Sequence, residues 1–221
     1  MKLTKLPLLA TLSLMTLTSV GDSWAQSTKR LIDEVNPFIG TSNFGTTNPG
    51  AVVPNGLMSI TPFNVSGSPE LNKFDKDKRW WSTPYTADNK FFSGFSHVNL
   101  SGVGCPELGS IIVSASTGDL DVDYTHYGSA MSQEKAHPGY YSVQLDKHKI
   151  KAEVTATQRT AVSAFTFERG GKSNILVNLG LGLTNESGAT VRFLNDSTIV
   201  GSKLMGTFCY APQAVFNQYF A

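Results

Sequence analysis

Residues 150 to 157 carry the clearest pattern of apolar and polar positions in the chain. Ala152, Val154 and Ala156 take alternate places, and the positions between them are polar. A period of two sends successive side chains to opposite faces of an extended backbone, so such a segment has one buried side and one solvent-facing side. The pattern predicts a half-buried β-strand over these residues.

Similar short runs follow one another through the second half of the chain, at intervals of roughly 10 to 15 residues. They cover residues 140–145, 150–157, 160–167, 175–179, 190–194, 198–204 and 215–221, and they are rich in Val, Thr and Phe. No window after residue 25 has a helical apolar stripe. Before residue 110, Gly, Pro and Asn turns predominate and predict few regular elements. The predicted fold class is all-β, an antiparallel β-sandwich.

The first 25 residues differ in character from the rest. Two lysines precede an apolar run over residues 6–17, and small residues lie around Ala25. This is the pattern of a secretory signal peptide, and the run is too short to span a bilayer. We predict a signal peptide over residues 1–25 with cleavage near Ala25, a secreted or periplasmic protein without a membrane span, and one β-sandwich domain over residues 26–221.

The composition favours a globular protein with little affinity for nucleic acid. Hydrophobic residues make up 40% of the chain, enough to bury a core, and the formal net charge is only +1 without a basic stripe. Proteins that bind nucleic acid carry clustered basic side chains, so this class of partner is excluded. In an oxidising compartment Cys105 and Cys209 can form a disulfide, and two separate buried thiols fit the sequence equally well.

Trp80 and Trp81 lie next to each other in a polar segment, residues 75–85, and not in an apolar run. An indole ring stacks on the C–H face of a sugar, while a neighbouring side chain such as Arg79 donates hydrogen bonds to sugar hydroxyls. In an extended segment adjacent side chains point in opposite directions, so one of the two rings is the candidate platform. The alternative is that both rings only hold this segment against the rest of the fold.

Residues with catalytic chemistry are scattered along the chain. Ser96, His97 and Cys105 have the residue types of a nucleophile and its base, but adjacent Ser and His rarely meet in the required geometry and no orienting acid is evident. A lone histidine such as His97 is more often satisfied by local hydrogen bonds. Glycosidases use two carboxyl groups, and the best candidate, Glu107, is not matched by a second one at an evident spacing. The residues alone identify no catalytic group.

No metal or phosphate site is evident in the sequence either. Asp119, Asp121 and Asp123 alternate, and on a strand they would line one solvated face without surrounding an ion. Gly102-Val103-Gly104 has two of the glycines of a phosphate-binding loop, but the third is misplaced and a strand pattern, not a helix, follows. We therefore predict no metal ligands in this chain.

Several motifs, in order along the chain, resemble the amino-terminal domain of glycoside hydrolase family 92. The motifs are Val35-Asn36-Pro37-Phe38-Ile39-Gly40-Thr41, Asn48-Pro49-Gly50-Ala51, Gly94-Phe95-Ser96-His97, Leu100-Ser101-Gly102, Pro138-Gly139-Tyr140-Tyr141-Ser142-Val143 and Ile150-Lys151-Ala152-Glu153-Val154-Thr155-Ala156-Thr157. The resemblance implies a supersandwich-like β-domain. Its companion in that family, a catalytic (α/α)6 barrel, does not appear in the 221 residues.

Members of this family are mostly inverting, calcium-dependent exo-α-mannosidases whose active site lies between the two domains. The resemblance implies mannose-containing glycans as substrates, with N-glycan degradation as the setting. In the family the barrel supplies the catalytic carboxyl groups and the main calcium ligands, so calcium is expected for the full-length enzyme with its ligands mainly outside this chain. The β-domain supplies loops that complete the pocket, which makes Trp80, Trp81, Arg79, Phe44 and His97 the candidate substrate-binding residues.

Two interpretations follow. In the first, the chain is the amino-terminal domain of an exported exo-α-mannosidase-like hydrolase, and its partner is the carboxyl-terminal (α/α)6 domain. Because residues 215–221 have the pattern of a strand with nothing after it, we expect a domain truncated at its carboxyl end and inactive alone. In the second, the chain is a stand-alone carbohydrate-binding module or an inactive fragment.

Overall fold

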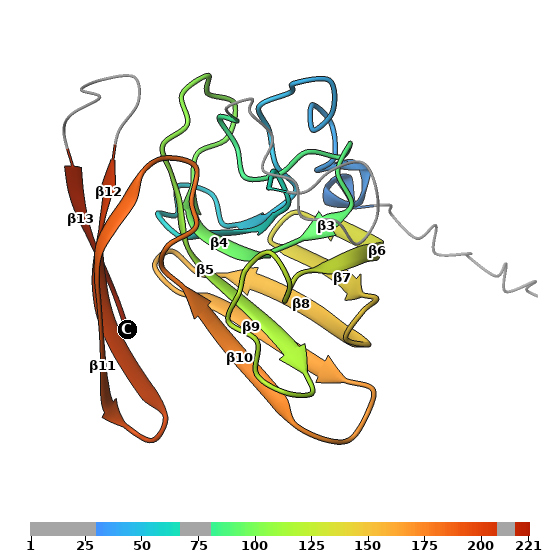
Figure 1. Cartoon of the computed structure of the whole chain (residues 1–221). Helices are drawn as coiled ribbons and strands as arrows, with labels where there is room; N and C mark the ends of the chain where they lie inside the picture. Colours follow the sequence, from blue (N-terminus) through green and yellow to red (C-terminus); the bar gives the residue numbers. More distant parts are fainter. Residues whose placement is uncertain (1–29, 67–80, 207–214) are drawn as a thin grey trace, which may run out of the picture.

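The computed structural model describes residues 30–66, 81–206 and 215–221 of the 221-residue chain. Within these residues the regular structure consists of β-strands and one short 3-10 helix, η1 (Leu31–Glu34). Every strand pair is antiparallel. The all-β antiparallel fold predicted from the alternating pattern is therefore confirmed (Figure 1).

The strands form three sheets (Figure 1). The first has the order β1 (Ala51–Val52), β2 (Ser59–Phe63), β4 (Gly94–Asn99), β5 (Leu108–Thr117) and β10 (Ser173–Asn178). The second has the order β3 (Phe91–Phe92), β6 (Ser129–His137), β7 (Tyr140–Leu145), β8 (Ile150–Ala156) and β9 (Ala161–Phe167). The third consists of β11 (Glu186–Asn195), β12 (Thr198–Gly206) and β13 (Val215–Phe220).

The main core lies between the first two sheets, which makes them a sandwich. The first sheet contributes Ala51, Ile60, Phe95 and Ala115, and the second contributes Met131, Tyr141, Val143, Leu145, Ile150, Ala152, Val154 and Ala156. The alternation predicted for residues 150–157 holds, because the apolar positions of β8 are buried while its Lys151 and Thr155 are exposed.

A smaller apolar cluster covers the opposite face of the first sheet. Because side chains alternate along a strand, Phe63 points away from the face that carries Ile60. The buried members of this cluster are Phe63, Val65, Trp81 and Ile112, and Leu181 and Leu183 pack against them. This cluster fixes Trp81 at the start of the segment that leads into the second sheet.

The region before residue 110 contains more regular structure than its sequence predicts. β2 and β4 form the middle of the first sheet, although Gly94 and Ser96 are residues typical of turns. The reason is steric: a Cβ atom at Gly94 would lie 2.3 Å from Cγ2 of Ile112, so close packing requires glycine. Ser96 is fully buried, and its hydroxyl donates to Oδ1 of Asn99 at 2.8 Å. The elements before residue 108 are short, as predicted, but the prediction did not place β2 and β4 inside a sheet.

The segment between β5 and β6 is a loop, so the strand considered for Asp119, Asp121 and Asp123 does not form. The carboxylates of Asp121 and Asp123 each accept a hydrogen bond from the backbone N–H two residues further on, at 2.9 Å in both cases. Short acidic side chains stabilise turns in this way, and these local bonds compete with strand pairing.

The third sheet stands beside the first, at the left of Figure 1, and contacts it at one end. Ser110 of β5 donates a hydrogen bond to the side chain of Gln218 in β13. At the same end, Lys203 of β12 and Glu186 of β11 form an ion pair at 2.5 Å, with side chains only 0% and 2% exposed. Burial raises the pKa of Glu186 and lowers the pKa of Lys203, while each partner opposes the shift of the other.

Candidate functional site

The Phe44 loop, residues 40–47, is a tightly closed turn ahead of β1. Thr47 closes it: its backbone N–H donates to the carbonyl of Gly40 (3.4 Å), and its hydroxyl donates to the carbonyl of Ile39 (2.7 Å). A Cβ atom at Gly45 would lie 1.8 Å from the Gly40 carbonyl oxygen, so the turn requires glycine at this position. Phe44 is therefore carried by a backbone with little freedom.

The backbone of the Phe44 loop is strained at Asn43 and Phe44. Asn43 and Phe44 both have positive φ angles, 52° and 62°. For a bulky residue such as phenylalanine this left-handed conformation is uncommon, and each such residue costs roughly 1–3 kcal/mol. Residues held in this way are concentrated at ligand sites, where the surrounding structure compensates the strain.

An aromatic stack between Phe44 and Trp81 compensates part of this backbone strain. The rings of Phe44 and Trp81 have their centroids 5.5 Å apart and are tilted by only 18°. Trp81 is 8% exposed and Phe44 is 62% exposed. The indole ring is therefore part of the fold, while the phenyl ring that rests on it is presented to solvent. A largely exposed aromatic ring suits the C–H face of a sugar.

Asn48 ties the Phe44 loop to the first sheet. Its Nδ2 group donates to the carbonyl of Leu100 (3.2 Å), and its Oδ1 atom accepts from the hydroxyl of Thr61 in β2 (2.8 Å). A Cβ atom at Gly50 would lie 1.8 Å from the same Thr61 hydroxyl, so the backbone here approaches β2 closely. The motif from Asn48 to Ala51 therefore connects the Phe44 loop to the first sheet.

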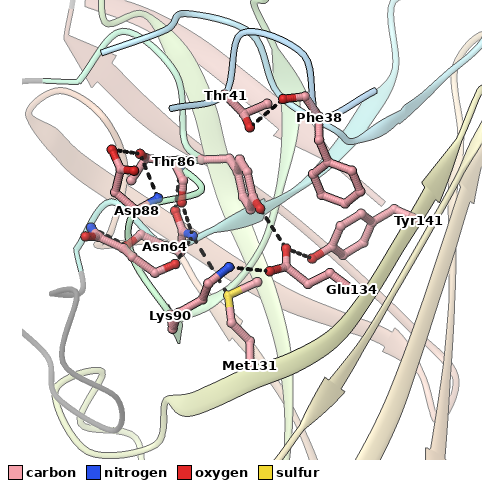
Figure 2. A network of polar contacts seen from close by, with 11 residues as sticks. Phe38, Thr41, Asn64, Thr86, Asp88, Lys90, Met131, Glu134 and Tyr141 are labelled. Atoms are coloured by element: carbon pink, nitrogen blue, oxygen red, sulfur yellow. Dashed lines mark hydrogen bonds and ion pairs between the residues drawn. The ribbon is translucent and has the colours of Figure 1, made fainter. Parts of the chain in front are cut away.

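The segment from Trp81 to Lys90 is held from the other side by Glu134 of β6 (Figure 2). The hydroxyls of Tyr85 and Tyr141 both donate to Oε2 of Glu134, at 2.7 and 2.8 Å, and Nζ of Lys90 pairs with Oε1 at 2.9 Å. Burial, followed by the Glu134 charge, raises the pKa of both tyrosines well above the ordinary value. Both hydroxyls therefore stay protonated and act as donors.

The side chain of His97 forms a hydrogen bond within the first sheet. Its Nδ1 atom lies 2.6 Å from the carbonyl oxygen of Ile111, which can only accept, so Nδ1 carries the proton. Burial lowers the pKa of the His97 imidazole, and the bond to Ile111 opposes this shift. This bond joins β4 to β5 at the point where their register shifts. Local hydrogen bonding, the alternative expected for a lone histidine, is therefore present. The pocket-lining role of His97 stays a prediction.

The other candidates from the sequence have mixed outcomes. Arg79 and Trp80 lie outside the described residues, as do the predicted signal peptide and Cys209, and they stay predictions. Cys105 is disulfide-bonded, which favours the bridged alternative. Glu107 is buried, 9% exposed, directly before β5. Within the described residues no group of three or more His, Cys, Asp or Glu side chains could hold a metal ion, and no helix has the length and apolar character that a membrane crossing requires.

Two hollows in the described part of the chain do not include Phe44. One hollow of about 360 Å³ is lined by Phe91, His126, Lys147 and their neighbours. Another, of about 520 Å³, lies on the third sheet and includes Val191 and Tyr219. The Phe44–Trp81 stack is part of neither.

Comparison with known proteins identifies the family of this chain. The model of the glycosyl hydrolase family 92 N-terminal domain matches residues 34–221, and the chain belongs to this family. It is similar to the family GH92 alpha-mannosidase BT3965 from Bacteroides thetaiotaomicron, with 30% identity and a TM-score of 0.74 over 86% of this chain. It is also similar to the GH92 hydrolase ccman5, with 26% identity and a TM-score of 0.63 over 85% of this chain.

A curated relative, an uncharacterized secreted glycosidase from Arthroderma benhamiae, is 28% identical over 157 residues, which is 65% of this chain. The chain spans only part of these proteins. It covers 19% of the Arthroderma glycosidase and 25% of both the BT3965 and ccman5 chains. What these relatives do as whole proteins therefore applies to this chain only as a proposal.

Proposed function

We propose that this chain supplies the sugar-binding half of the active site of an exported, inverting exo-α-mannosidase, acting on mannose-containing glycans. The observation that carries the proposal is the Phe44–Trp81 stack, in which a buried indole supports an exposed phenyl ring on a strained loop. In this proposal the ring of Phe44 contacts the C–H face of the terminal mannose. A helical domain provides the opposite wall and the carboxyl groups that activate water.

The relatives support the choice of sugar. The BT3965 structure is described as an alpha-mannosidase, and it has also been solved in complex with mannoimidazole. The Arthroderma relative is described as secreted, which agrees with export of this chain. Arg79 and Trp80 complete the proposed sugar contacts, as donor and second aromatic ring, and His97 lines the pocket from β4.

Calcium enters the proposal only through the complete enzyme. Calcium needs six to eight oxygen ligands, commonly from several carboxylates and carbonyls. The described residues gather no acidic cluster that could hold it. They therefore do not fit a calcium site of their own, and the part played by this chain is to bind and orient the sugar.

The proposal is tested by titrating methyl α-D-mannoside into the full chain and into the Phe44→Ala variant. Full burial of a phenylalanine side chain is worth roughly 1.5–3 kcal/mol. Covering one face of the ring recovers about half of this, so its loss should weaken binding about 4- to 12-fold. Calorimetry measures the change in dissociation constant directly.

Phe193→Ala is the matched control, because it removes a phenyl ring that is 77% exposed on the third sheet. It should leave the mannoside affinity unchanged. Equal affinity of the Phe44→Ala variant and the wild type would contradict the proposal. A folded wild-type chain that binds no mannoside would contradict the idea that this half of the site is preformed.

A further inference from the structure

The Phe44 loop is attached to the turn from Tyr85 to Lys90 at two places. The backbone N–H of Ala87 donates to the carbonyl of Thr41 at 2.8 Å. The backbone N–H of Asn43 donates to the carboxylate of Asp88, with Oδ2 at 3.3 Å. The second contact lies at the first residue of the left-handed pair, immediately before Phe44. It is therefore the contact best placed to control where the phenyl ring lies.

Asp88 is itself held within the turn. Its Oδ2 atom accepts from the hydroxyl of Thr86 (3.4 Å), and its backbone N–H donates to the same hydroxyl (3.3 Å). Figure 2 shows this reciprocal pair above the side chain of Asn64. The carboxylate thus has a defined direction toward the loop.

The turn is rigid because a buried amide holds its backbone. Asn64 is 0% exposed and directly follows β2. Its Nδ2 group donates to the carbonyls of Thr86 (2.8 Å) and Asn89 (2.9 Å), and its Oδ1 atom accepts from the N–H of Thr86 (2.8 Å). A buried amide with all these bonds satisfied resists any shift of the turn.

Glu134 clamps the two ends of the same turn. Tyr85 at one end and Lys90 at the other both bind its carboxylate, whose side chain is only 11% exposed. Figure 2 shows Glu134 between Lys90 and Tyr141, so a residue of the second sheet fixes a turn that serves the Phe44 loop. The turn is held at its middle by Asn64 and at its ends by Glu134, and Asp88 projects from it.

We propose that Asp88 is a positioning residue for the sugar platform. By accepting the N–H of Asn43 it keeps Asn43 and Phe44 in their left-handed conformation, and this places the ring of Phe44 on Trp81. Asp88 acts through Phe44 and does not itself contact sugar. The inference rests on the proposed function for its effect on sugar binding, whereas its effect on the position of the ring does not.

The test compares Asp88→Ala and Asp88→Asn with the wild type in the full chain. Nuclear magnetic resonance gives the hydrogen-exchange rate of the Asn43 amide and the ring contacts between Phe44 and Trp81, and calorimetry gives the affinity for methyl α-D-mannoside. In Asp88→Ala we expect at least tenfold faster exchange at Asn43, weaker ring contacts and several-fold weaker binding. Asp88→Asn keeps an acceptor oxygen and should restore all three, which a purely electrostatic role would not.

Asp123→Ala is the control, because its carboxylate also accepts a backbone amide, that of Thr125, in a surface loop. It should change none of the three measurements. Unchanged exchange at Asn43 and unchanged Phe44–Trp81 contacts in Asp88→Ala would overturn the inference. If the ring moves in Asp88→Ala while the wild type binds no mannoside, the positioning role stands and the proposed function fails.

Discussion

Phe44 and Trp81 are stacked, but the two side chains contribute differently to the stability of the fold. Trp81 packs with Phe63 and Ile112 and gains the full benefit of burial. Phe44 is 62% exposed and has a backbone conformation that costs free energy. Stability alone does not favour this arrangement. In the proposed function a ligand covers the phenyl ring, and apolar contact then balances the strain.

Two histidines make stability depend on pH. His148 donates from Nε2 to the carbonyl of Tyr127 (2.7 Å), and its Nδ1 atom accepts the N–H of Thr117 (3.3 Å), which only the neutral ring can do. Burial lowers the pKa of both His148 and His97 below the ordinary value of 6.5. Below that pH the unfolded chain binds more protons than the folded one, so stability is full above pH 6.5 and falls as the pH decreases.

We expect the free energy of unfolding to decrease from pH 7.5 to pH 5, by at most about 1.4 kcal/mol per pH unit for each histidine. Urea unfolding at several pH values measures this slope. His148→Gln should be less stable than the wild type at pH 8, where both rings are neutral, and should have a shallower slope below pH 6.5. A slope as steep as that of the wild type would contradict the assignment of this dependence to His148.

The sequence identified some of these residues and missed others for a physical reason. Trp81 is a candidate because an aromatic ring in a polar segment is unusual, and Phe44 is a candidate because its glycine-rich turn resembles a pocket-lining loop of a known family. Asp88 and Asn64 have no such signal. The bond between Asn43 and Asp88 joins positions 45 residues apart, and that between Asn64 and Thr86 joins positions 22 apart. One sequence does not show which distant polar residues meet.

At the scale of strands, prediction succeeds where alternation is the main signal. β8 alternates between buried and more exposed positions and β9 between half-buried and exposed ones, so their approximate bounds follow from the period of two. β4 is harder to predict because Gly94 and Ser96 are small residues: a Cβ atom at Gly94 would lie 2.3 Å from Cγ2 of Ile112, so close packing excludes a larger residue there. Small residues in a central strand look like a turn until the neighbouring strand is known.

The ion pair between Glu186 of β11 and Lys203 of β12 leads to a prediction about the stability of these strands. Lys203→Met leaves the carboxylate of Glu186 buried without its cation, and breaking a buried pair in this way costs roughly 3–5 kcal/mol. We expect the free energy of unfolding, measured with urea at pH 7, to decrease by this amount. The amides of β12 should also exchange their hydrogens faster. The double variant Glu186→Leu with Lys203→Met removes both charges and should recover most of the loss.

The single Glu186→Leu variant completes the cycle, because it leaves Lys203 as the unpaired charge. If the two single losses simply add in the double variant, the side chains do not interact, and the assignment of the pair to the stability of the third sheet is wrong.

At the scale of the whole molecule, the third sheet has a face that is only partly covered. Paired residues of antiparallel strands share a face, and the register places Val191, Phe193, Ile199 and Phe220 on the same side as buried Lys203 and Met205. One end of this face is closed against the first sheet, while Val191 is 52% and Phe193 is 77% exposed at the other. Exposed apolar surface next to a buried one favours contact with another apolar surface.

We therefore expect the full chain to associate with itself through this face as its concentration rises. Phe193→Ser removes a ring that is 77% exposed on this face. If association buries that ring, its loss costs at least about 1.5 kcal/mol and weakens the dimer about tenfold or more. Arg192→Ser is the matched control, because the neighbouring side chain lies on the opposite face and should leave association unchanged. Sedimentation equilibrium over a range of concentrations measures both constants. Equal weakening by the two variants would mean that association uses the sheet edge or another surface, since a face-specific contact responds to only one of them.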